Sequence, residues 1–566
     1  MGRYMGVVRL VSVWGLAGLV AAGAVALRAQ APQTVGGPEL AGHLRSAFAN
    51  VRQEALAELS TTERAQLSAV YARRGWAPLW VDGSFRPHAD AREALQIIAG
   101  AAGEGLDPRD YRAAQLTDQG AALGRVPTPE DADVAAFDVG LSASIVLYFH
   151  ALHAGRVDPR AIGFRMTTAE DDHDFSSLLV SALDAHRIAE TAAELAPQLA
   201  LYRQLRTELA RYRSLADPSL ALPVSAITAV RPGEPYGDLS ALRRVLVALG
   251  DWPGDLSTPG ESTVYDGAFV EGVKRFQIRH GLDADGVLGA QTLEALRVPL
   301  TWRVRQIELG LERLRWLPHL GKGRLLAVNI PMFRLWAWDS MVPGDVPAFG
   351  SRVIVGRALD TETPVFVEQM NHIIFRPYWN VPHSIVRDEI LPGLARAPNY
   401  LERQHMEIVD GPGDDARPVG ATPEALAQLR QGRLRLRQRP GASNALGLVK
   451  FVFPNDENVY LHGTPSTELF ARSRRDFSHG CVRVEDPVAL AEWALAGQNG
   501  WTRDRIQSAM NGTEPIRVNL ARPIPVILFY ITAAVTPEDG KVHFARDIYG
   551  HDPKLDRALA LRGGNR

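Results

Sequence analysis

Cysteine is almost absent from this sequence, because Cys481 is the only one among 566 residues. An intramolecular disulfide is therefore excluded, since it needs two thiols. A structural cysteine could usually be replaced by alanine, serine or valine, whereas a thiolate nucleophile activated by an imidazole has no such substitute. His462 and His479 lie close to Cys481 in the sequence. The scarcity of cysteine thus points to covalent catalysis.

An excess of either charge is also absent. The chain has 62 Lys and Arg residues against 64 Asp and Glu residues, a formal net charge of -2. This balance offers no general attraction for nucleic acid or for an anionic membrane surface, and we expect neither as a partner. The side chains of residues 171–174 (Asp-Asp-His-Asp) could ligate a metal, but their spacing fits no known site and favours a hydrated loop. We expect a monomer without metal or cofactor.

The N-terminus has the pattern of an export signal. Arg3 and Arg9 flank the start of an apolar run from Leu10 to Leu27, and Ala29-Gln30-Ala31 resembles a small-residue cleavage site. Residues 1–31 are therefore predicted to be a signal peptide or an uncleaved signal anchor, and we favour cleavage. The rest of the chain is expected outside the cytoplasm.

A chain of 566 residues is longer than one hydrophobic core normally supports, so several domains are expected. The first half of the chain is predicted to form two helical units. Residues 39–215 carry apolar side chains at three- and four-residue spacing, and residues 216–235 read as a linker. Residues 236–298 predict three short helices: Leu239–Leu249, Asp266–His280 and Gly289–Leu296. In its segments 273–277 and 281–289 this unit resembles the small three-helix peptidoglycan-binding domain.

Residues 302–535 change to strand character, so the whole chain is predicted to be a multidomain α+β protein. The expected strands are Arg324–Trp338, Arg352–Val355, His372–Phe375, Leu448–Phe453 and Asn458–His462, which predict a mixed β-sandwich or a barrel-like sheet. An insertion over about 384–441, with a helix at Ser384–Leu391, is typical of a lid. Asp486 predicts an N-cap before Pro487. Residues 536–566 form a C-terminal segment.

Residues 460–483 can supply the parts that thiol catalysis needs. Cys481 would be the nucleophile and His462 its general base, giving a thiolate–imidazolium pair that lowers the pKa of the thiol. Gly480 permits a tight backbone approach, and its carbonyl is predicted to hold the His462 ring. Backbone N–H groups of His479, Gly480 and Cys481 are predicted to face the carbonyl oxygen of a substrate.

His462, followed by Ser478-His479-Gly480-Cys481-Val482-Arg483, resembles the signature of the YkuD-like L,D-transpeptidase catalytic domain. The wider chain is similar to the large, three-part L,D-transpeptidases of Gram-negative bacteria, in segments 375–382, 444–451 and 547–552. The resemblance implies a scaffold domain for the helical region and a substrate-capping subdomain for the insertion. It also implies a periplasmic enzyme of peptidoglycan synthesis that contributes to cell wall organisation and cell shape.

The resemblance further implies a reaction. The thiolate attacks the carbonyl of the third residue of a tetrapeptide stem, usually meso-diaminopimelate, expels D-Ala and leaves a thioester. The side-chain amine of a second stem then forms a 3-to-3 cross-link. Stem peptides and glycan strands are thus the implied partners, and carbapenems are expected to acylate Cys481.

Substrate-binding residues are predicted around the nucleophile: Arg483, Ser478, Tyr460, Tyr378 and Trp379. Arg483 could bind a carboxylate or hold the loop through an ion pair, and the ion pair is slightly favoured. His479 could act in catalysis or shape the loop. The alternation from Arg433 to Arg439 could form a cationic strand face, but a solvated edge strand is favoured.

Three alternatives stay open at this point. The same nucleophile would serve an L,D-carboxypeptidase or an endopeptidase that uses water as acceptor. A non-catalytic peptidoglycan-binding scaffold would bind through residues 236–298 and would have a degenerate catalytic domain, which the intact His462, Gly480 and Cys481 disfavour. A papain-like protease is disfavoured, because that family has its cysteine early and its histidine late.

Overall fold

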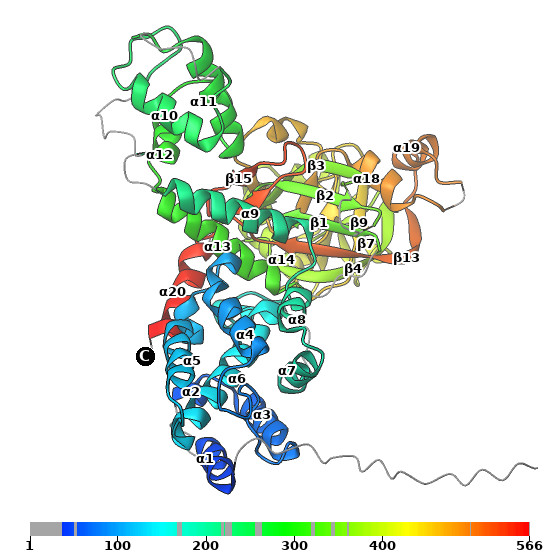
Figure 1. The fold of residues 1–566 in the computed structure, drawn as a ribbon. Coiled ribbons are helices and arrows are strands. Elements are labelled where there is room, and N and C mark those ends of the chain that lie inside the picture. Colours follow the sequence, from blue (N-terminus) through cyan, green and yellow to red (C-terminus); the bar gives the residue numbers. More distant parts are fainter. Residues whose placement is uncertain are drawn as a thin grey trace, which may run out of the picture.

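The computed structural model describes residues 37–49, 54–166, 173–216, 220, 229–254, 263–317, 323–340, 346–358, 361–498 and 500–564. The predicted signal over residues 1–31, and Asp171 and Asp172 of the acidic loop, lie outside these residues. In Figure 1 the helical region lies at the bottom, the three-helix unit at the top left and the β-rich region at the right. Helices α9 and α13 run between them.

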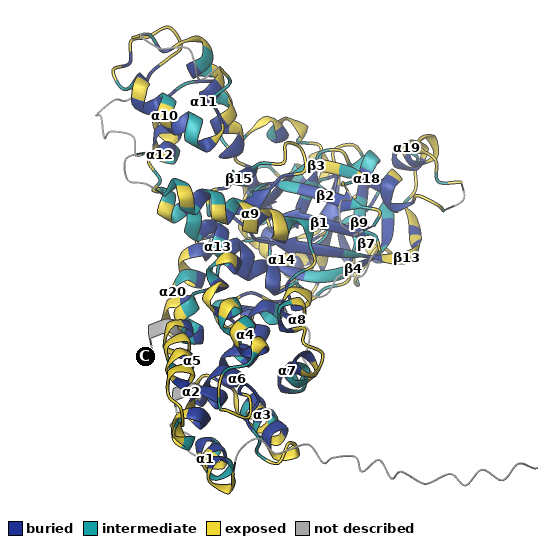
Figure 2. Ribbon diagram, in the orientation of Figure 1, coloured by how far each residue is buried: buried dark blue, intermediate teal, exposed yellow. Residues whose placement is uncertain are grey.

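The helical region is built around one central helix, α6 (Asp131–Ala154), and most of this helix is buried (Figure 2). Its length and composition would allow it to cross a membrane, but 83% of its apolar window is buried against other helices, as in a core helix. The surrounding helices are α1 (Pro38–Ala49), α2 (Glu54–Ala57), α3 (Thr61–Arg73), α4 (Ala89–Ala99), α5 (Ala113–Arg125), α7 (Phe175–Asp184), α8 (Ile188–Leu195) and α9 (Ala200–Leu215), with short 3-10 turns η1 (Ala101–Glu104), η2 (Pro108–Tyr111) and η3 (Pro159–Ile162).

Asp138 of α6 links the loop after α3 to the core through hydrogen bonds. Its carboxylate accepts from the backbone N–H groups of Leu79 and Trp80, at 2.9 and 2.8 Å, and from the hydroxyl of Tyr71 at 2.6 Å. Burial raises the pKa of Asp138 to about 6 despite these hydrogen bonds. This carboxylate thus organises packing inside the helical region.

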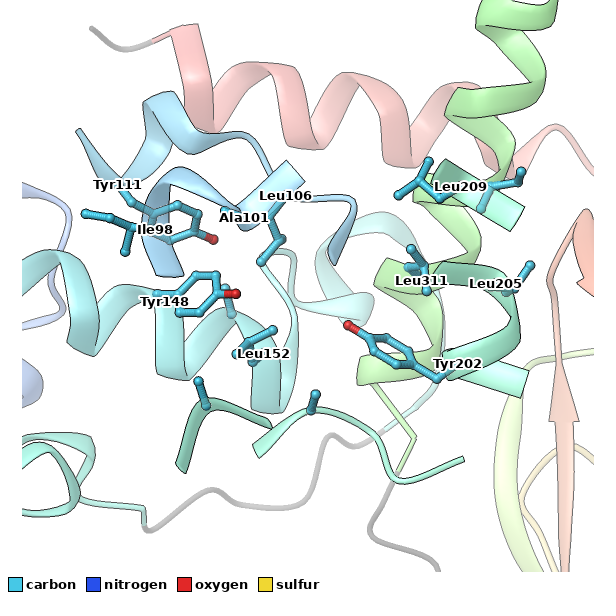
Figure 3. Packing of buried hydrophobic residues seen from close by; sticks show 14 of the residues in the cluster. Ile98, Ala101, Leu106, Tyr111, Tyr148, Leu152, Tyr202, Leu205, Leu209 and Leu311 are labelled. Carbon is cyan, nitrogen blue, oxygen red and sulfur yellow. The ribbon is translucent and has the colours of Figure 1, made fainter. Parts of the chain in front are cut away.

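Helix α13 (Leu300–Arg315) joins the helical region to the β-rich region. Figure 3 shows Tyr202, Leu205 and Leu209 of α9 beside Leu311 of α13. Arg315 is fully buried, and its guanidinium donates to Glu312 at 3.1 Å and to the hydroxyl of Tyr202 at 2.9 Å. Apolar packing and a compensated buried charge therefore hold this junction together.

The three-helix unit contains α10 (Leu239–Leu249), α11 (Gly267–Arg279) and α12 (Ala290–Leu296), which confirms the three predicted helices. Gly286 has φ of +71°, and a Cβ there would lie 2.7 Å from a Val270 methyl, so the turn requires glycine. The unit docks on a C-terminal hairpin, β14 (Ala533–Val535) and β15 (Val542–Phe544). Arg279 pairs with Asp251 and donates to the carbonyl of Val542 at 2.8 Å.

The β-rich region is a closed, barrel-like sheet rather than a sandwich. Its order is β11-β3-β12-β10-β9-β4-β13-β1-β2, and a further β2–β3 pairing closes it. The strands are β1 (Leu325–Asn329), β2 (Arg334–Trp338), β3 (Phe349–Gly356), β4 (Phe366–Phe375), β9 (Val449–Val452), β10 (Leu461–His462), β11 (Asp476–Ser478), β12 (Val482–Val484) and β13 (Ile516–Phe529). Strand alternation buries Leu461, Val482 and Val484 in one core. Closure pairs β2 with β3, and β11 is added to the end of β3 outside the closed circuit.

Three helices complete this region. In α18 (Pro487–Ala494), Asp486 accepts from the N–H of Ala489 at 2.9 Å, which confirms the predicted N-cap. Helix α19 (Arg503–Asn511) packs beside α18, and α20 (His551–Gly564) returns to contact α13. The C-terminal segment therefore contacts two other parts of the molecule: β15 contacts α11 of the three-helix unit, and α20 contacts α13.

The insertion has its own sheet and its own core. Its strands are β5 (Trp379–Val381), β6 (Met406–Asp410), β7 (Arg417–Val419) and β8 (Arg435–Gln438), in the order β5-β8-β6-β7. Its helices are α14 (His383–Ile385), the π-helical turn η5 (Val386–Ile390), α15 (Leu391–Arg396), α16 (Tyr400–Arg403) and α17 (Pro423–Arg430). The π turn ends two residues before Pro392, whose ring would clash with the carbonyl four residues earlier in a regular α-helix.

The expectation of a solvated edge strand at Arg433–Arg439 is wrong. Strand β8 lies between β5 and β6, so both of its edges are paired. Arg437 is buried, donates to Glu407 at 2.7 Å and lies 4.2 Å over the Tyr378 ring. The arginine is kept in the interior by an ion pair and an aromatic contact, which alternation of residue types does not reveal.

Candidate active site

The loop that carries Cys481 lies between β11 and β12 and is held by its own backbone. Gly480 has φ of +108°, a conformation that other residues rarely adopt. Ser478 Oγ donates to the Cys481 carbonyl at 2.5 Å and accepts from the Gly480 N–H at 3.2 Å. Ser478 therefore shapes the loop from a buried position, and the Gly480 N–H already has a partner.

A second set of hydrogen bonds supports the loop from below. Thr363 Oγ1 donates to the Gly480 carbonyl at 2.8 Å and accepts from the Gly356 N–H at 2.8 Å. Tyr549 donates to the Gly356 carbonyl at 2.6 Å and accepts from the Thr363 N–H at 3.1 Å. The Gly480 carbonyl thus serves Thr363, not the His462 ring as predicted, because β10 places His462 further along the sheet.

Cys481 is partly exposed, and its sulfur lies 3.7 Å from the Asn458 carbonyl. Burial raises the pKa of the Cys481 thiol, while hydrogen bonding from Tyr460 and the positive charges of Lys450 and Arg483 act in the opposite direction. The net effect raises the pKa, so the neutral thiol is favoured over the thiolate. Tyr460 is directly opposite Cys481, since its carbonyl accepts from the Val482 N–H at 3.1 Å.

His462 is buried, with 4% exposure, and its Nδ1 donates to the Gly463 carbonyl at 2.5 Å. Burial, followed by the charge of Arg483, lowers the pKa of His462 to about 3, so the ring is neutral. With its hydrogen on Nδ1, the ring keeps a lone pair on Nε2. In the parallel β10–β12 register His462 is opposite Arg483, and no hydrogen bond joins it to Cys481 among the described residues. The thiolate–imidazolium pair remains a prediction.

Lys450 was not among the predicted site residues. It is opposite His462 in the β9–β10 register, and its Nζ lies 3.7 Å from the centre of the Tyr460 ring. Burial lowers the pKa of Lys450, although Cys481 and Asp414 act to raise it. A lysine inside the apolar strand segment 448–453 was the available signal, because alternation sends its side chain away from the barrel core.

His479 connects the cysteine loop to the insertion. Its Nε2 lies 2.7 Å from Glu389 Oε1 of η5 and 3.4 Å from Arg357 Nη2. The structure therefore places this side chain beside a carboxylate of the insertion, at the border of the site.

The remaining predicted residues lie in one of two places. One is the floor of the site, formed by Cys481, Tyr460, His462, Lys450 and Arg483, and the other is the insertion. The Arg483 Nε is buried, and no described residue accepts its hydrogen bond. Tyr378 stacks on Arg437, and Trp379 packs against the core of the insertion. The structure thus brings Cys481, Tyr460, Arg483 and Lys450 together, with His462 on the same floor, while Tyr378 and Trp379 contact the insertion.

Three family models match the chain. Residues 323–517 match YkuD, the L,D-transpeptidase catalytic domain, residues 236–296 match "Putative peptidoglycan binding domain", and residues 65–209 match a scaffold domain. The closed sheet, the insertion and the cysteine loop lie in the first of these matches, and helices α10–α12 lie in the second.

A curated relative from Haemophilus influenzae, "Putative L,D-transpeptidase", is 33% identical over 254 residues. The match covers 45% of this chain and 49% of the relative, so the chain spans about half the length of the relative it matches. These matches confirm the resemblance found in the sequence motifs. The chain contains an L,D-transpeptidase catalytic domain of the YkuD family, a peptidoglycan-binding domain and a scaffold domain.

Proposed function

We propose that this protein is an L,D-transpeptidase that works on peptidoglycan outside the cytoplasm, through a thioester on Cys481. The observation that carries the proposal is a partly exposed thiol on a braced loop inside the matched catalytic domain. The peptidoglycan-binding domain on the same chain supports peptidoglycan as the partner.

In the proposed first half-reaction, Nε2 of His462 accepts the thiol proton and the sulfur attacks the carbonyl of the third stem residue. The bond to the terminal D-Ala breaks, and the proton passes to its amine, which leaves a thioester on Cys481. In the second half-reaction, an amine of another stem attacks the thioester, loses a proton and restores the thiol. The products are D-Ala and a 3-to-3 cross-link.

The charges of the floor support this chemistry. The thiolate forms between two cations, Lys450 and Arg483, and both favour the anion electrostatically. A substrate carboxylate would gain from the same two cations, since the Arg483 Nε has a free donor in the described structure. The neutral His462 offers a free ring nitrogen for the thiol proton, but its low pKa makes it a weak base, so the thiolate has to stabilise the imidazolium that forms.

Acylation tests the nucleophile. Incubation with meropenem or imipenem, followed by intact-protein mass spectrometry, is expected to show one adduct that is lost in Cys481→Ala. A matched control is Ser473→Ala, a nearby change outside the loop. An adduct that persists in Cys481→Ala would overturn the nucleophile.

Product analysis tests the acceptor. With disaccharide-tetrapeptide, a transpeptidase yields 3-to-3 dimers, whereas an L,D-carboxypeptidase yields tripeptide alone. A cross-linked substrate broken without new dimers would identify an endopeptidase. Normal cross-linking by a Cys481→Ala protein in cells lacking the wild type would instead favour a non-catalytic scaffold.

A further inference from the structure

A cavity of about 600 Å³ lies between the peptidoglycan-binding domain and the closed sheet, apart from the cysteine loop. Its walls come from the turn 278–284, from the segment 331–334 that leads into β2, from the segment 471–475, and from the C-terminal hairpin region 536–548. The contacts of Arg279 and the 2.9 Å hydrogen bond from Lys541 to the Gly250 carbonyl hold these walls in place. The cleft is therefore formed before any ligand binds.

Arginines line every side of the cleft, and those without an ion-pair partner share the wall built by the segments 331–334 and 471–475. Four arginines of the cleft have carboxylate partners: Arg279 with Asp251, Arg352 with Glu485, Arg474 with Asp476 and Arg546 with Glu294. Arg334, Arg472 and Arg475 also line the cleft, and no described carboxylate forms an ion pair with them. An unbalanced positive wall of this kind favours anionic groups.

Arg475 is a positively charged side chain that is held rigidly at the wall of the cleft. It is 7% exposed, and its guanidinium donates only to carbonyls: to Val353 at 3.2 Å, to Phe333 at 3.3 Å and to Arg472 at 2.5 Å. Burial lowers the pKa of Arg475 to about 10, with Arg334 and Arg352 next in effect, and it stays charged at neutral pH. A buried cation without a paired carboxylate is costly, and Glu485 and Asp283, which act on Arg475 without forming an ion pair with it, do not prevent the net fall of its pKa.

The segments that face this wall contribute carboxylates to the cleft. Asp283 comes from the turn of the peptidoglycan-binding domain, and Glu538 and Asp539 come from the C-terminal hairpin. Asp283 acts electrostatically on Arg475 across the cleft. Exposed Ile278 and half-buried Leu282 and Met332 add apolar surface. The cleft thus offers cations, carboxylates and apolar contact to one ligand.

We propose that this cleft is a second peptide site, which holds a zwitterionic peptidoglycan stem. Its carboxylates lie against Arg334 and Arg472, and its free ammonium lies toward Asp283. Strand β3 connects the two sites, with Arg352 at the cleft and Gly356 at the cysteine loop, about 13 Å apart in extended chain. Holding one stem there raises the concentration of its neighbours at Cys481. The identity of the ligand rests on the proposed function.

Co-sedimentation of the full-length chain with purified sacculi tests the cleft, in a Cys481→Ala background that prevents turnover. Arg334→Gln with Arg472→Gln is expected to weaken apparent affinity about three- to tenfold, and Arg334→Lys with Arg472→Lys to retain most of it. Asp283→Asn should weaken binding to native sacculi but not to sacculi with acetylated amines. The matched control is Arg160→Gln with Arg522→Gln, two exposed arginines outside the cleft.

Equal binding by the Gln pair and the control pair, or equal loss on sacculi stripped of stems, would overturn the second site. Carbapenem acylation of the same substitutions with Cys481 intact should match wild type. Acylation that fails in wild type as well would refute the proposed chemistry and leave the charge-dependent binding result standing. Weakened binding by the Lys pair as well as the Gln pair would also contradict recognition by charge.

Discussion

Buried charges are treated differently at the domain junctions and on the floor of the active site. At the junctions, Arg279 pairs with Asp251, Arg313 with Asp552 and Arg315 with Glu312, and all six side chains are at most 3% exposed. On the floor, Lys450 and Arg483 are half-buried, and no described carboxylate forms an ion pair with either. At the junctions, each buried arginine is paired with a carboxylate of the protein. On the floor, the two cations have no such partner among the described residues and can interact with an anion that forms or binds there.

The unpaired cations beside Cys481 lower the stability of the fold more than the paired charges at the junctions do. A buried cation without a counter-charge destabilises the folded state, and a chain selected for stability alone would pair it or replace it. Uncompensated charge beside a thiol is useful only when an anion forms or binds there. The following changes test whether the two regions differ in this way.

The largest effect is expected from Asp552→Ala, which leaves Arg313 buried without its carboxylate and also removes the acceptor of Thr532. We expect a loss of about 3–5 kcal/mol in the free energy of unfolding, measured by urea titration. The double change Arg313→Met with Asp552→Leu should recover part of it, because no charge is left unpaired. A loss below about 1 kcal/mol would contradict the structural role of the junction pair.

The next effect concerns His462 and acid. The pKa of His462 is about 3 in the fold and about 6.5 when unfolded, so below pH 6.5 only the unfolded chain takes up the proton. Its contribution is present above pH 6.5 and is lost as the pH falls toward 3, by about 1.4 kcal/mol per unit. His462→Asn should flatten the stability profile between pH 6 and 4, and the exposed His383→Asn should not. Parallel profiles would show that the ring is not buried in its neutral form.

Lys450→Met removes one floor cation while keeping an unbranched side chain. The pKa of Cys481 should rise further, so the rate of carbapenem acylation should fall roughly tenfold at neutral pH, an effect of about 1.4 kcal/mol, and recover at higher pH. Lys450→Arg should restore the neutral-pH rate. A uniform loss at every pH would indicate a packing role instead.

The smallest effect is expected from Glu389→Gln, which breaks the contact between the insertion and His479. The pair is half exposed, so we expect a change of about 0.2–1 kcal/mol in unfolding and less than about fivefold in acylation. The Asp388→Asn change next to it, whose partner is Arg387, serves as control. A large loss of acylation with unchanged stability would place Glu389 in the catalytic machinery.

Local sequence was sufficient where one element decides the outcome. The helices of the peptidoglycan-binding domain, the N-cap at Asp486 and the loop glycine at 480 follow from short patterns, because capping, periodicity and positive φ are local properties. The sequence did not distinguish a β-sandwich from a closed barrel. The β2–β3 pairing decides between them, and no residue pattern in these two strands indicates that they pair. Lys450 and Thr363 were missed because each acts on a loop distant in the chain. The predicted domain bounds and catalytic roles remain predictions.

By itself, the sequence determined that a lone thiol stands in a motif beside two histidines, with a peptidoglycan-binding unit on the same chain. Only the tertiary structure decided which groups surround that thiol: Tyr460 and two cations as its neighbours, a neutral histidine further along the floor, and Tyr549 bracing the loop from the far end of the chain. The physical reason is that charge and hydrogen-bond energies depend on distance and burial, which arise when strands far apart in the sequence pair in one register.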